Sequence, residues 1–432
     1  MERLNDFNYI GPETIKKSAE TFGTPHYLYD ERAIADKCAS LTSMPSAYGL
    51  TVRYAMKANS TRAVLQTVYK HGLKIDASSV NEAKRAVLAG ISHTDIMLTA
   101  QGAPDETETR TIREMTSRGM KYNVCSLNQL YNIGKFAAEN GIPLSMRVHP
   151  GVGSGETATR NTGDDYSCFG VHLEDVETAL GYAETKGIVF DCVHTHIGSG
   201  ADPRVWRDNV ERVLNILETY FPGARTASFG GGLKEARMPY ETAADTGELG
   251  RRAKDLIVAF HKKTGRRIKT EIEPGTFVLA NAGLIVTRVV DKKRTGKNGM
   301  NFIILDGGME MNARPVMYGS KHPFYIVKKT GELLFSEFKN KGGYPAVLAG
   351  RCCESGDSQC LGMDGVSEPR MMEEPDIGDF AVIGGAGAYC AAMSPYNYNS
   401  HLQAPEVYYT ENGELKLIRR RQTFEQLVVN EI

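Results

Sequence analysis

Residues 51–79 read TVRYAMKANSTRAVLQTVYKHGLKIDASS and contain one complete β–α–β repeat. A β-rich run at 51–57 is followed by an amphipathic helical pattern that closes on Gly72, and LKIDAS (73–78) begins a second strand. Parallel strands need a helical crossover of this kind between them. The stretch therefore predicts two neighbouring parallel strands joined by a helix.

The same alternation continues from this repeat to residue 273. Several of the intervening helical patterns begin with Ser or Asp and end with Gly, as capped helices do. The β-rich runs are 51–57, 73–78, 95–99, 121–125, 144–148, 188–197, 225–229 and 267–273. Eight strands with their crossovers predict a (β/α)8 TIM barrel. The alternation alone leaves a doubly wound open sheet as the alternative.

After residue 280 the rhythm changes to short β-rich runs separated by turns, such as LIVTRVV (284–290), NFIILD (301–306) and DFAVIGG (379–385). This pattern predicts a mostly antiparallel, sandwich- or barrel-like β domain. Because the first residues precede the barrel, we expect them to join that domain. The predicted domains are a barrel over 26–280 and a discontinuous β domain over 1–25 and 281–432.

The composition is that of an ordinary soluble globular protein, with 41% hydrophobic and 24% charged residues and a formal net charge of −1. It shows no electrostatic footprint for nucleic acid or an anionic membrane. The N-terminus has no signal-type apolar core, and no run approaches a membrane span. The eight cysteines show no zinc-type spacing. We expect a cytoplasmic protein with reduced thiols and no metal.

Polar residues and glycines gather where the predicted barrel strands end. They are Lys57, Asp76, Arg147, His196, Ser199, the glycine triplet 230–232 and Glu273. The carboxyl ends of barrel strands line one face, which carries the active site of this fold. A lone lysine there is usually only exposed, but this many features at one mouth predict a shared site.

The chemistry of these residues is coherent. A lysine at a barrel mouth forms an imine with an aldehyde, and a glycine-rich turn offers unobstructed backbone amides to a phosphate. A glutamate facing a pyridine nitrogen keeps it protonated, and a histidine can lie flat against the ring. Together they predict pyridoxal 5′-phosphate (PLP) as the cofactor. Because His194 lies two residues before His196, we place it on the opposite strand face and expect no two-histidine metal site.

Six motifs extend this prediction to a family. YAMKANS (54–60), HTHIGSG (194–200), FGGGL (229–233), EPGTF (273–277), CCESGD (352–357) and GAYCAAMSPYNYN (387–399) occur in this order. Together they resemble the PLP-dependent decarboxylases of the alanine-racemase fold, which act on diaminopimelate, ornithine and arginine. ARPVMYG (313–319) and LIRRRQTFEQL (417–427) bring the chain nearest to the diaminopimelate decarboxylases.

The resemblance implies a role for each matching cofactor residue. Lys57 would hold PLP as a Schiff base, His196 would stack on the ring and Glu273 would pair with its nitrogen. Asp76 and Arg147 match positions near the edge of the cofactor. The phosphate-binding positions would be Ser199, Gly231, Gly232, Gly275 and Tyr389.

The resemblance also implies a homodimer with shared active sites, in which Cys353 and Glu354 come from the neighbouring subunit. Cys353 would protonate the α-carbon after carbon dioxide leaves, and Glu354 would contact the distal amine of the substrate. Arg314 and Tyr318, together with Tyr389, match substrate-binding positions. Meso-2,6-diaminopimelate, converted to L-lysine in lysine biosynthesis, is therefore the expected substrate.

Two positions depart from the family pattern. Thr276 stands where the family has an arginine that helps to bind the distal carboxylate, and Cys168 stands where it has a lysine. The first departure leaves open the same reaction on a related amino acid, or on a polyamine or siderophore precursor, without a plain distal carboxylate. A racemase would need an opposing base rather than CESGD. A catalytically retired regulatory homologue is the alternative of another class.

Overall fold

The structure is a computed structural model that describes residues 2–154, 161–199 and 202–432. The chain divides into two compact units. The barrel unit comprises residues 37–234 and 243–277, and the β unit comprises 1–36, 235–242 and 278–432.

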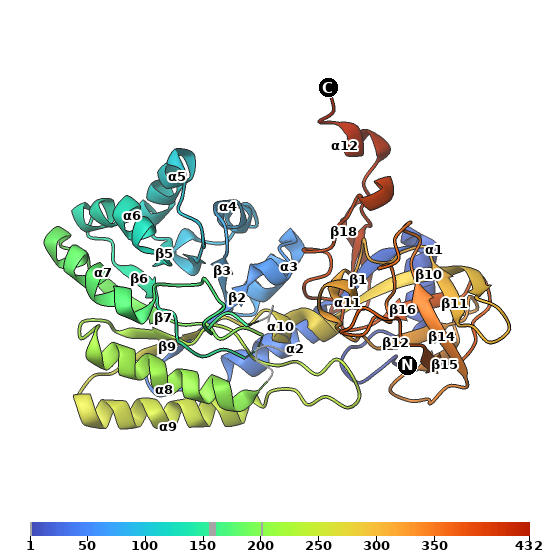
Figure 1. The fold of residues 1–432 in the computed structure, drawn as a ribbon, viewed down its shortest axis with the longest axis horizontal. Coiled ribbons are helices and arrows are strands. Elements are labelled where there is room, and N and C mark those ends of the chain that lie inside the picture. Colours follow the sequence, from blue (N-terminus) through green and yellow to red (C-terminus); the bar gives the residue numbers. More distant parts are fainter. Residues whose placement is uncertain (1, 155–160, 200–201) are drawn as a thin grey trace. The chain divides into compact units, whose positions relative to one another are not determined.

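The barrel unit is a closed parallel barrel, as the β–α–β alternation predicts (Figure 1). Its strands are β2 (Leu50–Ala55), β3 (Lys74–Ala77), β4 (Ile96–Leu98), β5 (Lys121–Val124), β6 (Leu144–Arg147), β7 (Phe190–His194), β8 (Thr226–Ser228) and β9 (Lys269–Ile272). The pairing of β2 with β9 closes the ring. Every predicted β-rich run contains one of these strands, and the open-sheet alternative is excluded.

Helices cross between consecutive barrel strands and lie outside the barrel. They are α3 (Arg62–Lys70), α4 (Val80–Leu88), α5 (Glu106–Ser117), α6 (Leu127–Glu139), α7 (Leu173–Lys186), α8 (Pro203–Thr219) and α9 (Thr246–Thr264), with the 3₁₀ turns η1 (Met56–Ala58) and η2 (His93–Asp95). Ser79, Ser126 and Asp245 cap α4, α6 and α9 through their side chains. These caps satisfy backbone N–H groups that a helix start leaves unpaired.

The β unit holds one ten-stranded sheet whose main path runs β13-β12-β16-β10-β1-β17-β18. The strands on this path are β1 (His26–Asp30), β10 (Gly283–Arg294), β12 (Phe324–Val327), β13 (Leu333–Ser336), β16 (Phe380–Ile383), β17 (Glu406–Tyr409) and β18 (Leu415–Arg419). Beside it, β11 (Asn301–Leu305) pairs with β10 and with β14 (Tyr344–Ala349), and β15 (Arg370–Met372) pairs with β14. Most pairs are antiparallel, whereas β1–β17 and β11–β14 are parallel.

Short helices complete the β unit. They are α1 (Pro12–Phe22), α11 (Arg314–Tyr318), α12 (Phe424–Val428) and the 3₁₀ turns η4 (Ala280–Ala282) and η5 (Tyr398–Ser400). Two further helices, α2 (Glu31–Thr42) and α10 (Thr276–Leu279), each contain residues of both units. Its core packs Ile15 and Ala19 of α1 against Leu28, Val286 and Val382 of the sheet. None of the described helices is long and apolar enough to cross a membrane.

The unit boundaries differ from the predicted domain boundaries at residues 26–36, 235–242 and 278–280. Residues 26–36 lie in the β unit, because β1 pairs with β10 and β17 rather than with a barrel strand. Residues 235–242 also belong to the β unit, although they lie between β8 and α9 in the sequence. Arg237 shows why, because its Nε donates to the Gly385 carbonyl at 3.0 Å. A contact this far apart in sequence leaves no local signal.

Candidate active site

Glu273 is one of the buried residues among the predicted cofactor set. It follows β9, it is 6% exposed, and its backbone N–H donates to the Gly230 carbonyl at 2.8 Å. His194 Nε2 lies 2.8 Å from Glu273 Oε2, and Ser228 Oγ lies 3.4 Å from Oε1. Burial alone would raise the pKa of this carboxyl, but the hydrogen bond and charge of His194, together with Arg147, hold it below its ordinary value. Glu273 is therefore held as a carboxylate.

His194 corrects one prediction. It was placed on the strand face opposite His196, but its side chain reaches the Glu273 carboxylate inside the barrel. Residues two apart on a strand share a face, so the placement was wrong. The signal that could have found His194 is its position at the end of β7, because the ends of all the barrel strands, including β9 before Glu273, meet at one mouth.

Asp76, at the mouth of β3, is also buried. Thr99 Oγ1 donates to its Oδ1 at 2.7 Å. Burial and the charge of Glu273 raise the pKa of Asp76, while Thr99 and Lys57 act against them. The charges of Glu273 and Lys57 both act on the Asp76 carboxyl, so these three predicted residues influence one another electrostatically.

Arg147 ends β6 with 6% of its surface exposed, and its guanidinium lies 5.0 Å from the centre of the Phe169 ring. Burial lowers its pKa, and the nearby Cys125, Glu273 and Asp76 only partly offset this. Its Nη2 is buried without a hydrogen-bond partner among the described residues. A buried donor without a partner is costly, which fits a site that receives an acceptor from a bound group.

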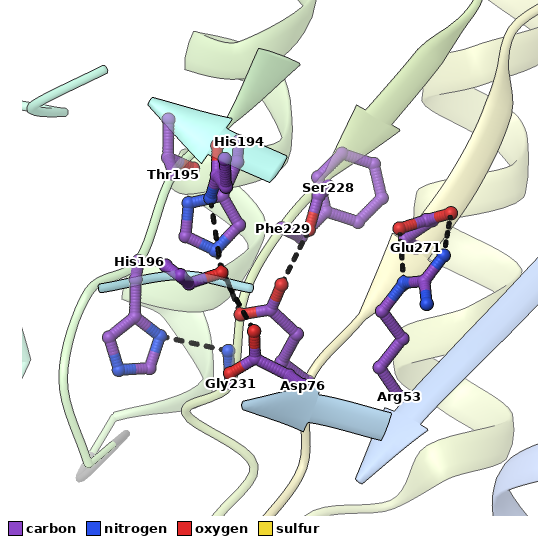
Figure 2. Close-up of polar contacts among 12 residues, drawn as sticks. Arg53, Asp76, His194, Thr195, His196, Ser228, Phe229, Gly231 and Glu271 are labelled. Carbon is purple, nitrogen blue, oxygen red and sulfur yellow. Dashed lines mark hydrogen bonds and ion pairs between the residues drawn. The ribbon is translucent and has the colours of Figure 1, made fainter. Parts of the chain in front are cut away.

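His196 follows β7, the glycine triplet follows β8, and the two segments are joined by a hydrogen bond. The Gly231 N–H donates to His196 Nδ1 at 2.9 Å (Figure 2). Burial, with Lys57 and Arg147, keeps the pKa of His196 well below its ordinary value, so the ring is neutral. This backbone amide, which we expected to face a phosphate, is therefore engaged by the imidazole.

The triplet requires glycine for steric reasons. Gly230 has φ 63°, and a Cβ there would lie 2.5 Å from the Thr195 carbonyl oxygen. A Cβ on Gly231 would lie 2.7 Å from the Glu273 carbonyl oxygen, and Gly232 has φ 98°. Because these residues have no Cβ, the turn can pack directly against the segment that carries Glu273.

Three further barrel residues complete the comparison with the predicted set. Ser199 Oγ is buried without a hydrogen-bond partner among the residues that the structure describes, and Gly275 is buried. Lys57 lies in η1, directly after β2, and is exposed. An amine at the mouth, unpaired buried donors and a glycine turn fit a cofactor with an aldehyde and a phosphate.

Figure 2 also shows a buried ion pair that sequence reasoning missed. Arg53 Nε and Nη2 donate to the two Glu271 carboxylate oxygens at 2.7 and 3.0 Å, and Lys121 Nζ lies 3.3 Å from Oε1. Although burial opposes it, Arg53 and Lys121 lower the pKa of Glu271 to about 2. Glu271 and Glu273 lie two residues apart and so share the inner face of the barrel. That spacing was the available signal.

Of the remaining predicted residues, Thr276 begins α10 at the end of the barrel unit and is half-buried, and the others lie in the β unit. Arg314 begins α11 and is 2% exposed, its Nε is buried without a partner among the described residues, and its guanidinium lies 5.8 Å from the Tyr318 ring centre. Tyr389 has φ 59°, an unusual conformation for a residue with a side chain. Such strain is concentrated at functional sites.

Cys353 and Glu354 are both exposed. The Cys353 N–H donates to Asn399 Oδ1 at 2.6 Å, and Glu354 accepts from the Tyr398 hydroxyl at 3.2 Å. The neighbouring Cys352 is half-buried with its thiol 3.5 Å from a Glu310 oxygen. Burial and the carboxylates of Glu310 and Asp357 raise its pKa, so Cys352 is kept as a thiol.

Comparison with known proteins agrees with this geometry. Residues 32–280 match the family described as pyridoxal-dependent decarboxylase, pyridoxal binding domain. The chain is 32% identical over 427 residues to a diaminopimelate decarboxylase of Escherichia coli, covering 97% of this chain and 96% of that protein. It is 33% identical over 429 residues to one of Streptomyces coelicolor, covering 98% and 92%.

The fold leads to the same relatives. A crystal structure of a diaminopimelate decarboxylase matches with a TM-score of 0.88 and 31% identity, covering 97% of this chain and 96% of that one. The chain is thus a PLP-dependent amino-acid decarboxylase whose barrel is the cofactor-binding domain. Within that class it belongs to the diaminopimelate decarboxylase family.

Proposed function

We propose that this enzyme decarboxylates meso-2,6-diaminopimelate to L-lysine and carbon dioxide. The observation that carries the proposal is the buried Arg314, whose unpaired Nε suits a carboxylate, in a chain that aligns along its length with diaminopimelate decarboxylases. Arginine binds carboxylates through charge-assisted hydrogen bonds. A substrate with a second carboxylate at its far end would supply that partner.

The barrel residues take the cofactor roles in this proposal. Lys57 would hold PLP through its aldehyde, and Glu273 would hold a proton at the ring nitrogen. His196 would lie against the ring, and Asp76 and Arg147 would contact its edge. The phosphate would be bound by Ser199, Gly232 and Gly275, by the Gly231 N–H once it leaves His196 Nδ1, and by Tyr389 of the β unit. When bound, PLP supplies a ring that accepts the electron pair left by carbon dioxide.

The ionisation states of the described groups support these roles. A carboxylate at Glu273 can accept a hydrogen bond from a protonated ring nitrogen. A neutral His196 can pack against the ring without adding a third cation to Lys57 and Arg147. The barrel therefore stabilises negative charge that develops in the ring without placing a competing proton donor over it.

We further propose that the enzyme is a homodimer in which Cys353 and Glu354 complete the site of the partner. Cys353 Sγ would deliver the proton to the substrate α-carbon, and Glu354 would contact the distal amine. Exposed apolar side chains in the same unit support an interface, namely Val316, Met317, Met363, Tyr396 and Tyr398. Large exposed apolar side chains of this kind are candidates for protein–protein contacts.

Thr276 favours a second candidate, the same reaction on an amino acid without a plain distal carboxylate. A threonine hydroxyl gives a neutral hydrogen bond of about 0.5–1.5 kcal/mol, against about 1.5–3 kcal/mol for a bond to a charged group. Arg314 and Tyr318 would then bind the far end of the substrate without a second arginine from position 276.

A substrate panel with product analysis tests the proposal. It would compare meso-diaminopimelate, ornithine, lysine, arginine and carboxynorspermidine at equal enzyme concentration. The expected result is the highest kcat/KM for meso-diaminopimelate, with L-lysine as product. Faster turnover of a monocarboxylate would establish the second candidate instead.

A further inference from the structure

His194 is buried at the end of β7 and touches the acid expected to face the cofactor ring. Only 1% of its surface is exposed, and its Nε2 lies 2.8 Å from Glu273 Oε2. A carboxylate oxygen can only accept, so Nε2–H is the donor. The other ring nitrogen, Nδ1, is buried without a partner among the described residues. The Glu273 contact is thus the polar contact that orients the ring.

This contact leaves the two Glu273 oxygens in different states. Oε2 accepts a short hydrogen bond from His194, whereas the contact of Oε1 within the described part of the chain is the longer one of 3.4 Å with Ser228 Oγ. His194 and Ser228 end neighbouring strands and are paired in register. One oxygen is therefore anchored to the barrel, and the other keeps its capacity to accept.

The buried pair of Arg53 and Glu271 also affects the charge of the Glu273 carboxylate. Glu271, two residues earlier on the same inner face, would repel the Glu273 carboxylate if it stood alone. Arg53 forms two hydrogen bonds to Glu271 and neutralises it. Of the two buried acids that act on Glu273, Glu271 is paired with Arg53, and Asp76 accepts a hydrogen bond from Thr99.

We propose that His194 is a positioning residue for the cofactor: it anchors Glu273 Oε2 so that Oε1 is presented to the ring nitrogen of PLP. The inference rests on the proposed role of Glu273. Residues that orient a ligand-contacting group in this way contribute substantially to affinity although they do not touch the ligand.

The test measures PLP affinity by fluorescence titration of the full-length chain after bound cofactor has been removed. The variants are His194→Leu, which removes the donor, His194→Gln, which keeps an N–H donor, Glu273→Gln, and His194→Leu combined with Glu273→Gln. Cys192→Ala is the matched control, because Cys192 is buried on the same strand and contributes no hydrogen bond to Glu273. Melting temperatures verify folding.

His194→Leu is expected to weaken PLP binding about 10- to 100-fold, the effect of losing one hydrogen bond to a charged group. His194→Gln should recover most of that loss, and Cys192→Ala should leave the affinity unchanged. In the Glu273→Gln background, His194→Leu should add little, because the two residues act through one contact.

Equal effects of His194→Leu in both backgrounds would overturn the inference, since a merely structural histidine would behave that way. If Glu273→Gln weakens binding and His194→Leu does not, the inference fails while the proposed role of Glu273 stands. If Glu273→Gln binds PLP as tightly as wild type, the proposed role of Glu273 fails. Should His194→Leu not fold, His194→Asn, which is too short to reach Oε2, replaces it.

Discussion

The charged cofactor residues of the barrel unit and the CESGD segment of the β unit are held in opposite ways, although Lys57 in the barrel is exposed and Arg314 in the β unit is buried. In the barrel, Asp76, Arg147 and Glu273 are each at most 6% exposed and are linked to one another by charge. In the β unit, Cys353 and Glu354 are exposed. The cofactor residues are thus pre-set by the fold of one chain, whereas the proposed proton donor waits at a surface. We infer that binding of PLP needs one chain and turnover needs two.

Lys57→Ala gives the largest expected effect and tests the barrel half of the comparison. Without the amine that holds the aldehyde, turnover should fall by more than about a thousand-fold. Borohydride reduction of wild type followed by peptide mapping should place the pyridoxyl group on Lys57. A label on another lysine would remove the basis for every cofactor role assigned here.

Mixing two inactive variants tests the β-unit half. Lys57→Ala and Cys353→Ala should each be nearly inactive, and random re-association should restore about a quarter of wild-type activity, because half of the dimers carry one intact site out of two. Activity is measured after subunit exchange has been verified by mass spectrometry of tagged chains. No recovery after verified exchange would mean that Cys353 serves its own chain or no site.

Arg53→Met probes how strongly the buried charges depend on one another. Removing one partner of a buried ion pair leaves the other uncompensated, which costs about 3–5 kcal/mol. Urea unfolding should show this loss, and Arg53→Met combined with Glu271→Met should recover most of it. Glu354→Gln, at the exposed segment, is the control and should leave stability within about 0.5 kcal/mol of wild type.

The pH dependence of the free energy of unfolding gives a second test of the buried pair of Arg53 and Glu271. The pKa of Glu271 is lowered to about 2, so its stabilising contribution is present above the unfolded-state value near 4.5 and is lost as pH falls towards 2. The free energy of unfolding should therefore decline between about pH 4.5 and pH 2. The Arg53→Met and Glu271→Met double variant should show a shallower decline; an identical slope would mean that other carboxyls dominate.

Thr276→Arg carries the smallest expected effect. Replacing a neutral hydrogen bond by a charged one adds about 1 kcal/mol, so the KM for meso-diaminopimelate should fall about fivefold. Thr276→Lys, with a point charge in place of the planar fork, serves as the comparison and should help less. If Thr276→Arg instead converts a preference for a monocarboxylate into one for diaminopimelate, Thr276 is the residue that sets a different native substrate.

The sequence alone determined the parallel β–α alternation, because each β–α–β repeat is a local pattern of hydrophobic period, capping residue and glycine. Closure into a barrel rather than an open sheet rests on the pairing of β2 with β9. The sequence also determined that the chain uses PLP, since Lys57, Glu273 and the glycine triplet sit at strand ends whose position follows from the fold. The family resemblance added the motifs of the β unit.

Only the tertiary structure decided how these residues are ionised and held. The hydrogen bond from His194 to Glu273 and the pairing of Arg53 with Glu271 join residues 79 and 218 positions apart. The placement of residues 235–242 in the β unit depends on contacts of the same long range. Such contacts arise from the closure of the barrel and the assembly of the sheet. A local pattern cannot encode them, because the partners share no periodicity along the chain.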